Sequence, residues 1–186
     1  MTLAVRKIEE MVPLARAYTE DGFCQRFNHP FILGKEVLEE EFVFRTRVAT
    51  EASMVGPPPA ASSTANGEAP LRIRDWVLPL DKAGASNGST RIFLGRASNN
   101  DLVVPHPTVS KLHAYFSKDH DKWWLIDVGS SNGTKMNGMR APTRARVSLN
   151  DGDTLVFGKC VFTFVSARRL YELLTHLAGH GASSQP

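Results

Sequence analysis

From Trp76 onward the sequence consists of short apolar runs separated by residues that favour turns. Short runs bounded by Gly, Asn, Asp, Ser and Pro are typical of β-strands, and Asn-Gly or Asp-Gly between two runs favours a tight hairpin. Such dipeptides occur at Asn87-Gly88, Asn132-Gly133, Asn137-Gly138 and Asp151-Gly152. The pattern therefore predicts an all-β sandwich. The predicted strands are Trp76–Leu80, Arg91–Gly95, Leu102–Val104, Ala114–Ser117, Trp123–Ile126, Thr154–Phe157 and Val161–Val165.

The sequence before these runs divides into two segments. Residues 1–50 are predicted to contain a helix and a strand, because apolar residues recur at helical spacing over 3–18 and alternate over Phe42–Val48. Pro13 kinks this helix or opens a second one. Residues 51–70, rich in Pro, Ala and Ser, are predicted to be a flexible linker. The role of residues 1–50 stays open between a docking module, a phosphorylated tail and a cover for the sandwich.

Residues 167–186 are predicted to form a C-terminal amphipathic helix followed by a disordered end. Apolar residues recur there at intervals of three and four, and the helix is expected to stop near Gly179. The residues of the apolar stripe are Leu170, Leu173, Leu174 and Leu177.

The sequence contains no signal for a membrane or for secretion. No apolar run approaches the roughly 20 residues that cross a bilayer, and the first ten residues carry charges where a signal peptide would be apolar. Cys24 and Cys160 match neither a metal site nor a disulfide framework. We therefore expect a cytoplasmic protein with two reduced thiols and no membrane partner.

The basic charge of the chain is concentrated in one segment. The whole chain carries a formal net charge of +3, whereas residues 71–166 hold thirteen Lys or Arg and eight Asp or Glu, a net charge of +5. This segment is expected to prefer an anionic partner.

The sequence shows no residue pattern typical of an enzyme. Gly84–Thr90 superficially suggests a phosphate loop, but Ser89 stands where such a loop needs Lys. The six histidines include no pair at metal-ligand spacing, and Ser110 with His113 has no triad signature. We therefore expect no catalytic residue, no metal and no cofactor.

Groups that bind anions stand instead in three predicted turns at strand ends. An Arg offers a planar fork of donors that suits phosphate, and Ser hydroxyls and Lys add short charge-assisted contacts. An Asn amide can hold an extended peptide backbone. Together these turns could form a phosphate pocket. They are Gly95-Arg96, Thr108–His113 and Gly129–Thr134.

The same turns belong to a longer series of motifs that resembles the forkhead-associated (FHA) domain family. The series runs in order from Ile92 to Val165, and with the preceding strands the resemblance covers residues 71–166, about half of the chain. It implies a β-sandwich of about eleven strands whose loops at one end bind phosphothreonine in a partner protein. The motifs are Gly95-Arg96, Asn100-Asp101-Leu102, Val109–Ala114, Asp127–Thr134, Asn137-Gly138, Leu149–Asp153 and Gly158.

The resemblance also implies a role for each matched residue. Lys111 is a mild departure, because Arg is frequent at that position in the family and a point charge here replaces a fork of donors. By resemblance, the phosphate-binding residues are Arg96, Ser110, Lys111 and Ser131, the residues that bind the peptide backbone are Asn132 and Asn137, and the residues that support the site are Gly95, His113, Gly133 and Asp127.

The favoured interpretation is a non-catalytic adaptor in Ser/Thr kinase signalling. Its partner would be a phosphothreonine-containing protein, either a Ser/Thr kinase or its substrate. One alternative is a phosphate-independent scaffold or dimerisation module, although such a protein has no need of Arg96, Ser110 and Asn132. Another is a nucleic-acid-binding regulator, suggested by the charge of residues 71–166. Nucleic acid is not the expected partner, because the sequence lacks a helix-turn-helix, a basic helix and a stacking platform.

Overall fold

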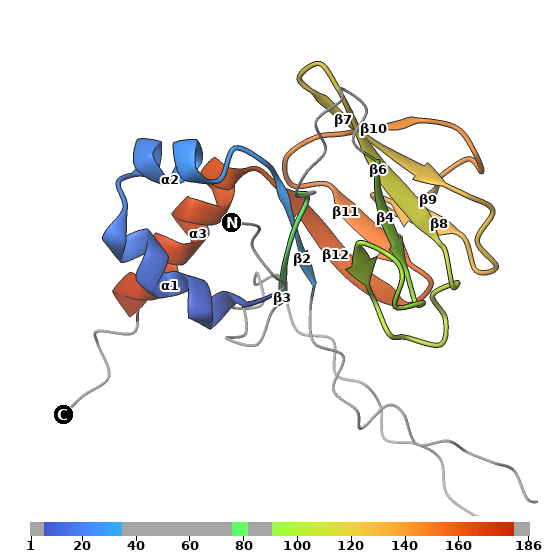
Figure 1. Ribbon diagram of the computed structural model, residues 1–186, viewed down its shortest axis with the longest axis horizontal. Coiled ribbons are helices and arrows are strands. Elements are labelled where there is room, and N and C mark those ends of the chain that lie inside the picture. Colours follow the sequence, from blue (N-terminus) through green and yellow to red (C-terminus); the bar gives the residue numbers. More distant parts are fainter. Residues whose placement is uncertain (1–5, 35–75, 82–90, 181–186) are drawn as a thin grey trace, which may run out of the picture. The chain divides into compact units, whose positions relative to one another are not determined.

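The computed structural model describes residues 6–34, 76–81 and 91–180 (Figure 1). These residues all belong to one compact unit. The predicted strand Phe42–Val48, the predicted linker 51–70 and the predicted disordered end after residue 180 lie outside the described residues.

The described strands form two sheets whose inner faces share one core, which confirms the predicted mainly β sandwich. Among the described pairs of neighbouring strands, only β4 and β5 run parallel. The seven-stranded sheet has the order β1 (Arg6–Lys7), β3 (Trp76–Pro79), β2 (Phe31–Gly34), β12 (Cys160–Val165), β11 (Thr154–Phe157), β8 (Thr134–Met136) and β9 (Met139–Arg140). The five-stranded sheet has the order β10 (Val147–Leu149), β7 (Lys122–Asp127), β6 (Ala114–Asp119), β4 (Arg91–Gly95) and β5 (Leu102–Val103).

The core between the sheets consists of alternate residues of facing strands. In β12, Phe162 and Phe164 are buried, whereas Val161, which directly precedes Phe162, is 44% exposed. The ring of Phe157 in β11 lies 6.2 Å from that of Phe116 in the opposite sheet and 5.7 Å from that of Phe162, measured between centroids. These aromatic contacts join the two sheets.

One strand of the sandwich comes from the N-terminal segment and is not among the predicted strands. β2 lies between β3 and β12, and its four residues are all buried. Ile32 packs in the core between the sheets, while Phe31 and Leu33 pack in a second core on the other face. Because both faces are covered, β2 lacks the alternation by which a half-buried strand is recognised. The sandwich therefore extends beyond the expected range 71–166.

The other strands missing from the prediction are shorter. β1, β8, β9 and β10 have two or three residues each, and most of their side chains are polar or charged. Strands of two or three residues are too short to show the alternation of apolar and polar side chains that identifies a strand in the sequence. The seven predicted strands are all present, with ends that differ by at most two residues.

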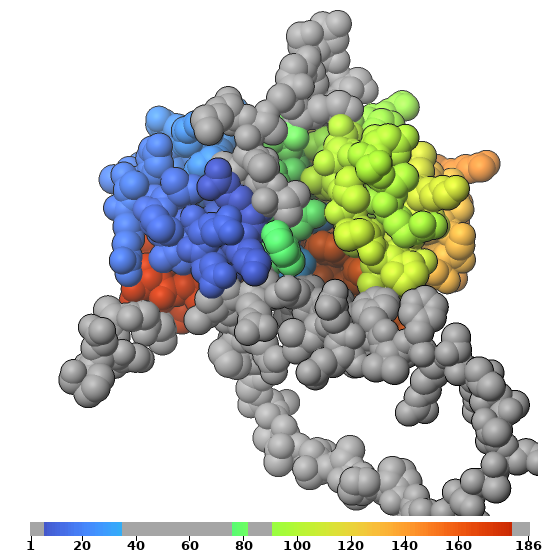
Figure 2. Space-filling model, turned by 60° about the horizontal axis from the view of Figure 1, so that its bottom comes forward, coloured from blue at the N-terminus to red at the C-terminus, as the bar shows by residue number. Residues whose placement is uncertain are grey.

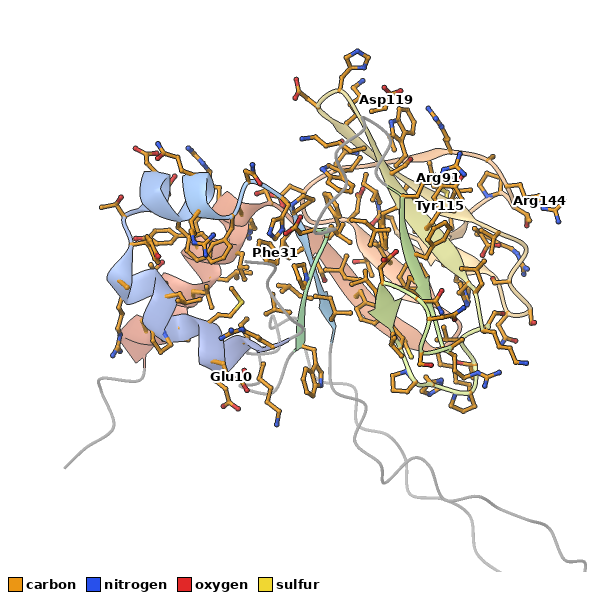
Figure 3. All side chains as sticks on the ribbon, viewed as in Figure 1. Glu10, Phe31, Arg91, Tyr115, Asp119 and Arg144 are labelled. Atoms are coloured by element: carbon orange, nitrogen blue, oxygen red, sulfur yellow. The ribbon has the colours of Figure 1, made fainter. Side chains whose placement is uncertain are left out.

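Three helices cover the outer face of the seven-stranded sheet at β2, β3 and β12 (Figure 1). The predicted C-terminal helix is confirmed, and its Leu170 and Leu174 are fully buried. They pack in the second core with Phe31, whose position between helices and sheet is labelled in Figure 3. Figure 2 shows the N-terminal helices, in blue, against the C-terminal helix, in red. The helices are α1 (Ile8–Ala17), α2 (Glu20–Arg26) and α3 (Ala167–His180).

The N-terminal helices are tied to α3 by polar contacts as well. The Tyr171 hydroxyl donates to the carbonyl oxygen of Tyr18 (3.1 Å), and Arg168 Nε lies 3.1 Å from Glu20 Oε1. Pro13 lies inside α1, and the second helix begins instead after Thr19, whose Oγ1 accepts a hydrogen bond from the Gly22 N–H. Among the described residues, no helix is long and apolar enough to cross a membrane.

Candidate functional site

Three loops meet at one end of the sandwich, and Gly95 makes their approach possible. The Arg96 N–H after β4 donates to the Ser110 carbonyl oxygen (2.9 Å). A Cβ on Gly95 would overlap the Lys111 carbonyl oxygen and lie 2.8 Å from Asn100 Nδ2. Only glycine therefore fits between the two loops.

A pair of serines joins the second loop to the third. The Ser131 N–H donates to Ser110 Oγ (3.0 Å), and Ser110 Oγ donates to Ser131 Oγ at 3.4 Å. Ser131 is exposed and Ser110 is half-buried. Two hydroxyls separated by 21 residues in the sequence thus lie together at the surface.

Two cationic side chains lie on the same loops. Arg96 Nε donates to the Val109 carbonyl oxygen (3.2 Å), which orients the guanidinium while its terminal nitrogens make no hydrogen bond to any described residue. Lys111 follows Ser110 directly and is exposed. Within the described part of the chain neither cation forms an ion pair. The arrangement suits an anionic ligand with several oxygens.

Asn132 lies in the third loop next to the serines. Its Nδ2 donates to the Thr108 carbonyl oxygen (2.8 Å), so the amide is held at the surface between the second and third loops. Its Oδ1 makes no hydrogen bond to a described residue and can accept one from a peptide N–H.

Asn137, to which the resemblance gives a role in binding the peptide backbone, lies in a different turn from Asn132. It has a φ of 51° in the turn at the opposite end of β8 from Gly133. Its Nδ2 donates to Asp153 Oδ1 and its Oδ1 accepts from the Thr154 N–H, both at 2.8 Å. Both amide atoms bond within the chain, so Asn137 stabilises this turn, and its role toward a peptide stays a prediction.

His113 lies beneath the second loop and is fully buried. Its Nδ1 accepts a hydrogen bond from the Ser110 N–H (3.1 Å), so a neutral ring carries its proton on Nε2, which lies 3.9 Å from Asp127 Oδ2. Burial lowers the pKa of His113, opposed by the Asp127 carboxylate and by the Gly133 backbone. Because His113 contacts the N–H of Ser110 and not its hydroxyl, it is placed to hold the loop and not to activate a nucleophile.

Asp127 organises the third loop. Its carboxylate accepts hydrogen bonds from the N–H groups of Gly129 and Ser130 and from the hydroxyls of Ser130 and Thr134, at 2.6 to 2.9 Å. Burial by itself raises the pKa of Asp127, but these four bonds outweigh it and hold the pKa below its ordinary value. The loop that carries Ser131 is thus built around a buried carboxylate.

Four further residues at this end of the sandwich escaped the sequence reasoning as contributors to the site. Asn100 belongs to a motif of the family, and its Nδ2 donates to the Ala97 and Lys111 carbonyl oxygens (2.7 Å each). Thr108 begins the second predicted turn, and its carbonyl oxygen and Oγ1 accept from Asn132 and from the Lys159 N–H. Arg140 and Lys159 carry no signal in the sequence, because only the fold brings them here.

Among the described residues, no group of three or more His, Cys, Asp or Glu could hold a metal ion. The donors and cations of the three loops offer hydrogen bonding and charge attraction toward an anion.

Comparison with known proteins connects this site to a family. The FHA domain model matches residues 92–158. An oxoglutarate dehydrogenase inhibitor of Corynebacterium efficiens is 31% identical over 135 residues, which cover 69% of this chain and 89% of that protein. The glycogen accumulation regulator GarA of Mycobacterium tuberculosis is 36% identical over 102 residues, which cover 52% of this chain and 61% of that protein.

Two solved structures are similar over about half of the chain. Mycobacterium tuberculosis EmbR in complex with a low-affinity phosphopeptide is 30% identical with a TM-score of 0.42, covering 48% of this chain and 21% of that one. The N-terminal FHA domain of Rad53p from S. cerevisiae, in complex with a phosphothreonine peptide, is 16% identical with a TM-score of 0.44, covering 52% and 88%.

Proposed function

The chain belongs to the forkhead-associated (FHA) domain family, and we propose that the loop cluster at the end of its sandwich binds phosphothreonine in a partner protein. In this proposal the phosphate lies among Arg96, Ser110, Lys111 and Ser131, and Asn132 binds the backbone of the partner. Gly95, His113, Gly133 and Asp127 hold these groups in place.

The observation that carries the proposal is the hydrogen bond from the Ser131 N–H to Ser110 Oγ. It brings two hydroxyls together on loops that also carry the exposed cations Arg96 and Lys111. The carboxylate of Asp127 is only 2% exposed and is occupied by hydrogen bonds, so it does not repel an anion at the surface. A phosphate dianion complements this set of donors.

We further propose that this binding makes the chain a non-catalytic adaptor of Ser/Thr kinase signalling. Support comes from the relatives, which are named for inhibiting oxoglutarate dehydrogenase and for regulating glycogen accumulation. The partner is then a Ser/Thr kinase or its substrate, and the place of action is the cytoplasm, where kinases have ATP. The binding unit in this proposal is residues 71–166 together with β2.

The test is a calorimetric titration of the full chain with a phosphothreonine peptide, comparing wild type with Arg96→Ala and Arg146→Ala. Losing one partner of a charge-assisted pair costs about 2 to 5 kcal/mol, roughly thirtyfold to several thousandfold in affinity. Arg96→Ala should lose that much affinity at unchanged thermal stability, because its side chain is exposed. Arg146→Ala should bind as wild type does, because Arg146 pairs with Asp119 at the other end of the sandwich.

A pull-down separates the adaptor from a phosphate-independent scaffold. Partners captured by the wild type should be lost when the extract is treated with phosphatase and when Arg96→Ala is used as bait. Equal capture in all three cases would favour the scaffold.

A further inference from the structure

We propose that the site binds a second anionic group of the same ligand, next to the phosphothreonine, through Arg140 and Lys159. The group is an acidic side chain or a second phosphate, which share the chemistry that a cation recognises. The inference rests on the function proposed above and adds a second point of recognition to that site.

Arg140 reaches the third loop of the site from β9. Its guanidinium lies against Gly133, where an added Cβ would be 2.8 Å from Nη2. Gly133 has a φ of 75° and follows Asn132 directly. The absence of a side chain at Gly133 therefore lets the guanidinium lie beside the residue that is placed to bind the ligand backbone.

Lys159 reaches the same place from the turn between β11 and β12. Its N–H donates to Thr108 Oγ1 (3.0 Å), and the Thr108 carbonyl oxygen accepts the bond from Asn132 Nδ2. The preceding residue, Gly158, donates its N–H to the Gly133 carbonyl oxygen at 3.4 Å. Arg140 and Lys159 thus border the two backbones that meet behind Asn132.

The charge of these two residues is uncompensated within the described part of the chain, where neither forms an ion pair. Arg140 also stands directly opposite Lys135 in the pairing of β8 with β9. Like charges in that position repel each other, and an anion placed there would relieve the repulsion.

The charge of one phosphate is too small to satisfy the whole set. A phosphothreonine carries about −1.5 to −2 at pH 7. Arg96, Lys111, Arg140 and Lys159 together carry four positive charges, all exposed. A second anion on the Asn132 side therefore has two cations available after the phosphate is bound.

The experiment titrates the full chain with a phosphothreonine peptide of neutral flanks and with variants that carry one Glu at each flanking position in turn. A further peptide carries a second phosphothreonine at the best position. At that position Glu should raise affinity about three- to tenfold, the effect of one partly exposed charge-assisted hydrogen bond. The gain should shrink at 1 M salt, where charges are screened within about 3 Å. If the second phosphate raises the affinity more than Glu does, the second anionic group that the site prefers is a phosphate and not an acidic side chain.

Variants assign the gain to residues through one ratio, the affinity for the Glu peptide divided by the affinity for the neutral peptide. The ratio should fall toward one in R140Q or K159Q and should stay at the wild-type value in R146Q. A ratio near one at every position in the wild type, or one that survives the double change R140Q/K159Q, overturns the proposal. If no phosphothreonine peptide binds the wild type, the proposed function itself fails.

Discussion

At the scale of single residues, the approach of two loops depends on Gly95. The atoms nearest to a Cβ at this position include the Lys111 carbonyl oxygen and Leu112 Cα, which belong to the backbone. A flexible side chain could turn away from an added methyl, but a backbone can move only together with its loop. Ser110 directly precedes Lys111, so its position depends on the absence of a side chain at Gly95.

We predict that Gly95→Ala lowers both stability and phosphopeptide affinity, because the loop that carries Ser110 and Lys111 must shift. Overpacking of this kind costs about 1 to 3 kcal/mol in unfolding free energy. Gly179→Ala is the matched control, since a Cβ there meets nothing within 4 Å and Ala favours the helix. Chemical denaturation and calorimetry measure the two effects. Wild-type affinity in Gly95→Ala would show that the loops tolerate the shift.

A second prediction concerns His113, whose Nδ1 holds the Ser110 N–H. His113→Ala leaves that partly buried donor without a partner, at a cost of about 1 to 3 kcal/mol, and should weaken binding as well. His113→Asn offers an oxygen in place of Nδ1 and should recover part of both. Full stability combined with a selective loss of binding would instead indicate direct contact with the ligand.

The same residue predicts how stability depends on pH. Because burial lowers the pKa of His113, the unfolded chain binds the proton more tightly than the folded one. The stabilising contribution is therefore fully present above the unfolded pKa of about 6.5 and is lost as pH falls toward the lower folded pKa. The pKa of His106 is also lowered, first by burial and then by Lys159, and contributes with the same sign.

Urea denaturation of wild type and His113→Asn at pH 7.5, 6.5 and 5.5 measures this dependence. The wild type should lose more stability than His113→Asn as the pH falls over that range. His106 is present in both proteins and should account for part of the loss in the variant. Parallel curves for the two proteins would contradict the assignment to His113.

At the scale of elements, β2 connects the N-terminal segment to the sandwich. Phe31 is fully buried in the core between the sheet and the helices, and its ring lies 6.2 Å from that of Phe27. Gly34 at the other end of β2 lies flat against Phe162, with room for no Cβ. The strand is thus a permanent part of the sheet and not a docked tail.

We predict that Phe31→Ala destabilises the whole unit by about 3 to 5 kcal/mol, the cost of truncating a buried Phe. Unfolding should stay a single transition, because the strand pairs with both β3 and β12. Met139→Ala, at a side chain that is 73% exposed, should change stability by less than about 0.5 kcal/mol. A loss of helical signal alone, with the sandwich unaffected, would show that the two layers fold independently.

At the scale of the whole molecule, the property to test is the choice of phosphorylated residue. We predict that phosphothreonine binds more than tenfold better than phosphoserine in the same peptide. Burying one methyl contributes about 0.8 kcal/mol, close to fourfold, and the β-branch of Thr leaves less rotamer freedom to lose on binding. Calorimetric titration with two peptides that differ only in phosphothreonine or phosphoserine measures this ratio of affinities. Near-equal affinities would mean that the pocket recognises charge alone.

The sequence by itself determined what depends on local pattern. Turn dipeptides and short apolar runs predicted seven strands, because a hairpin is specified by residues next to each other. The motifs around Arg96, Ser110 and Ser131 predicted a cluster at one end of the sandwich, and in the structure these residues do meet. The spacing of the leucines likewise predicted α3, because a helix repeats every 3.6 residues.

Only the tertiary structure decided what depends on residues far apart in the sequence. β2 shows no period because both of its faces are buried, and its partner β12 lies more than 120 residues later. Asn137 looks like Asn132 in the sequence, yet its amide is used by Asp153 and Thr154 across the sheet. Arg140 and Lys159 reach the site through the pairing of strands. Such placements are set by which surfaces pack together, and no local window of sequence contains that information.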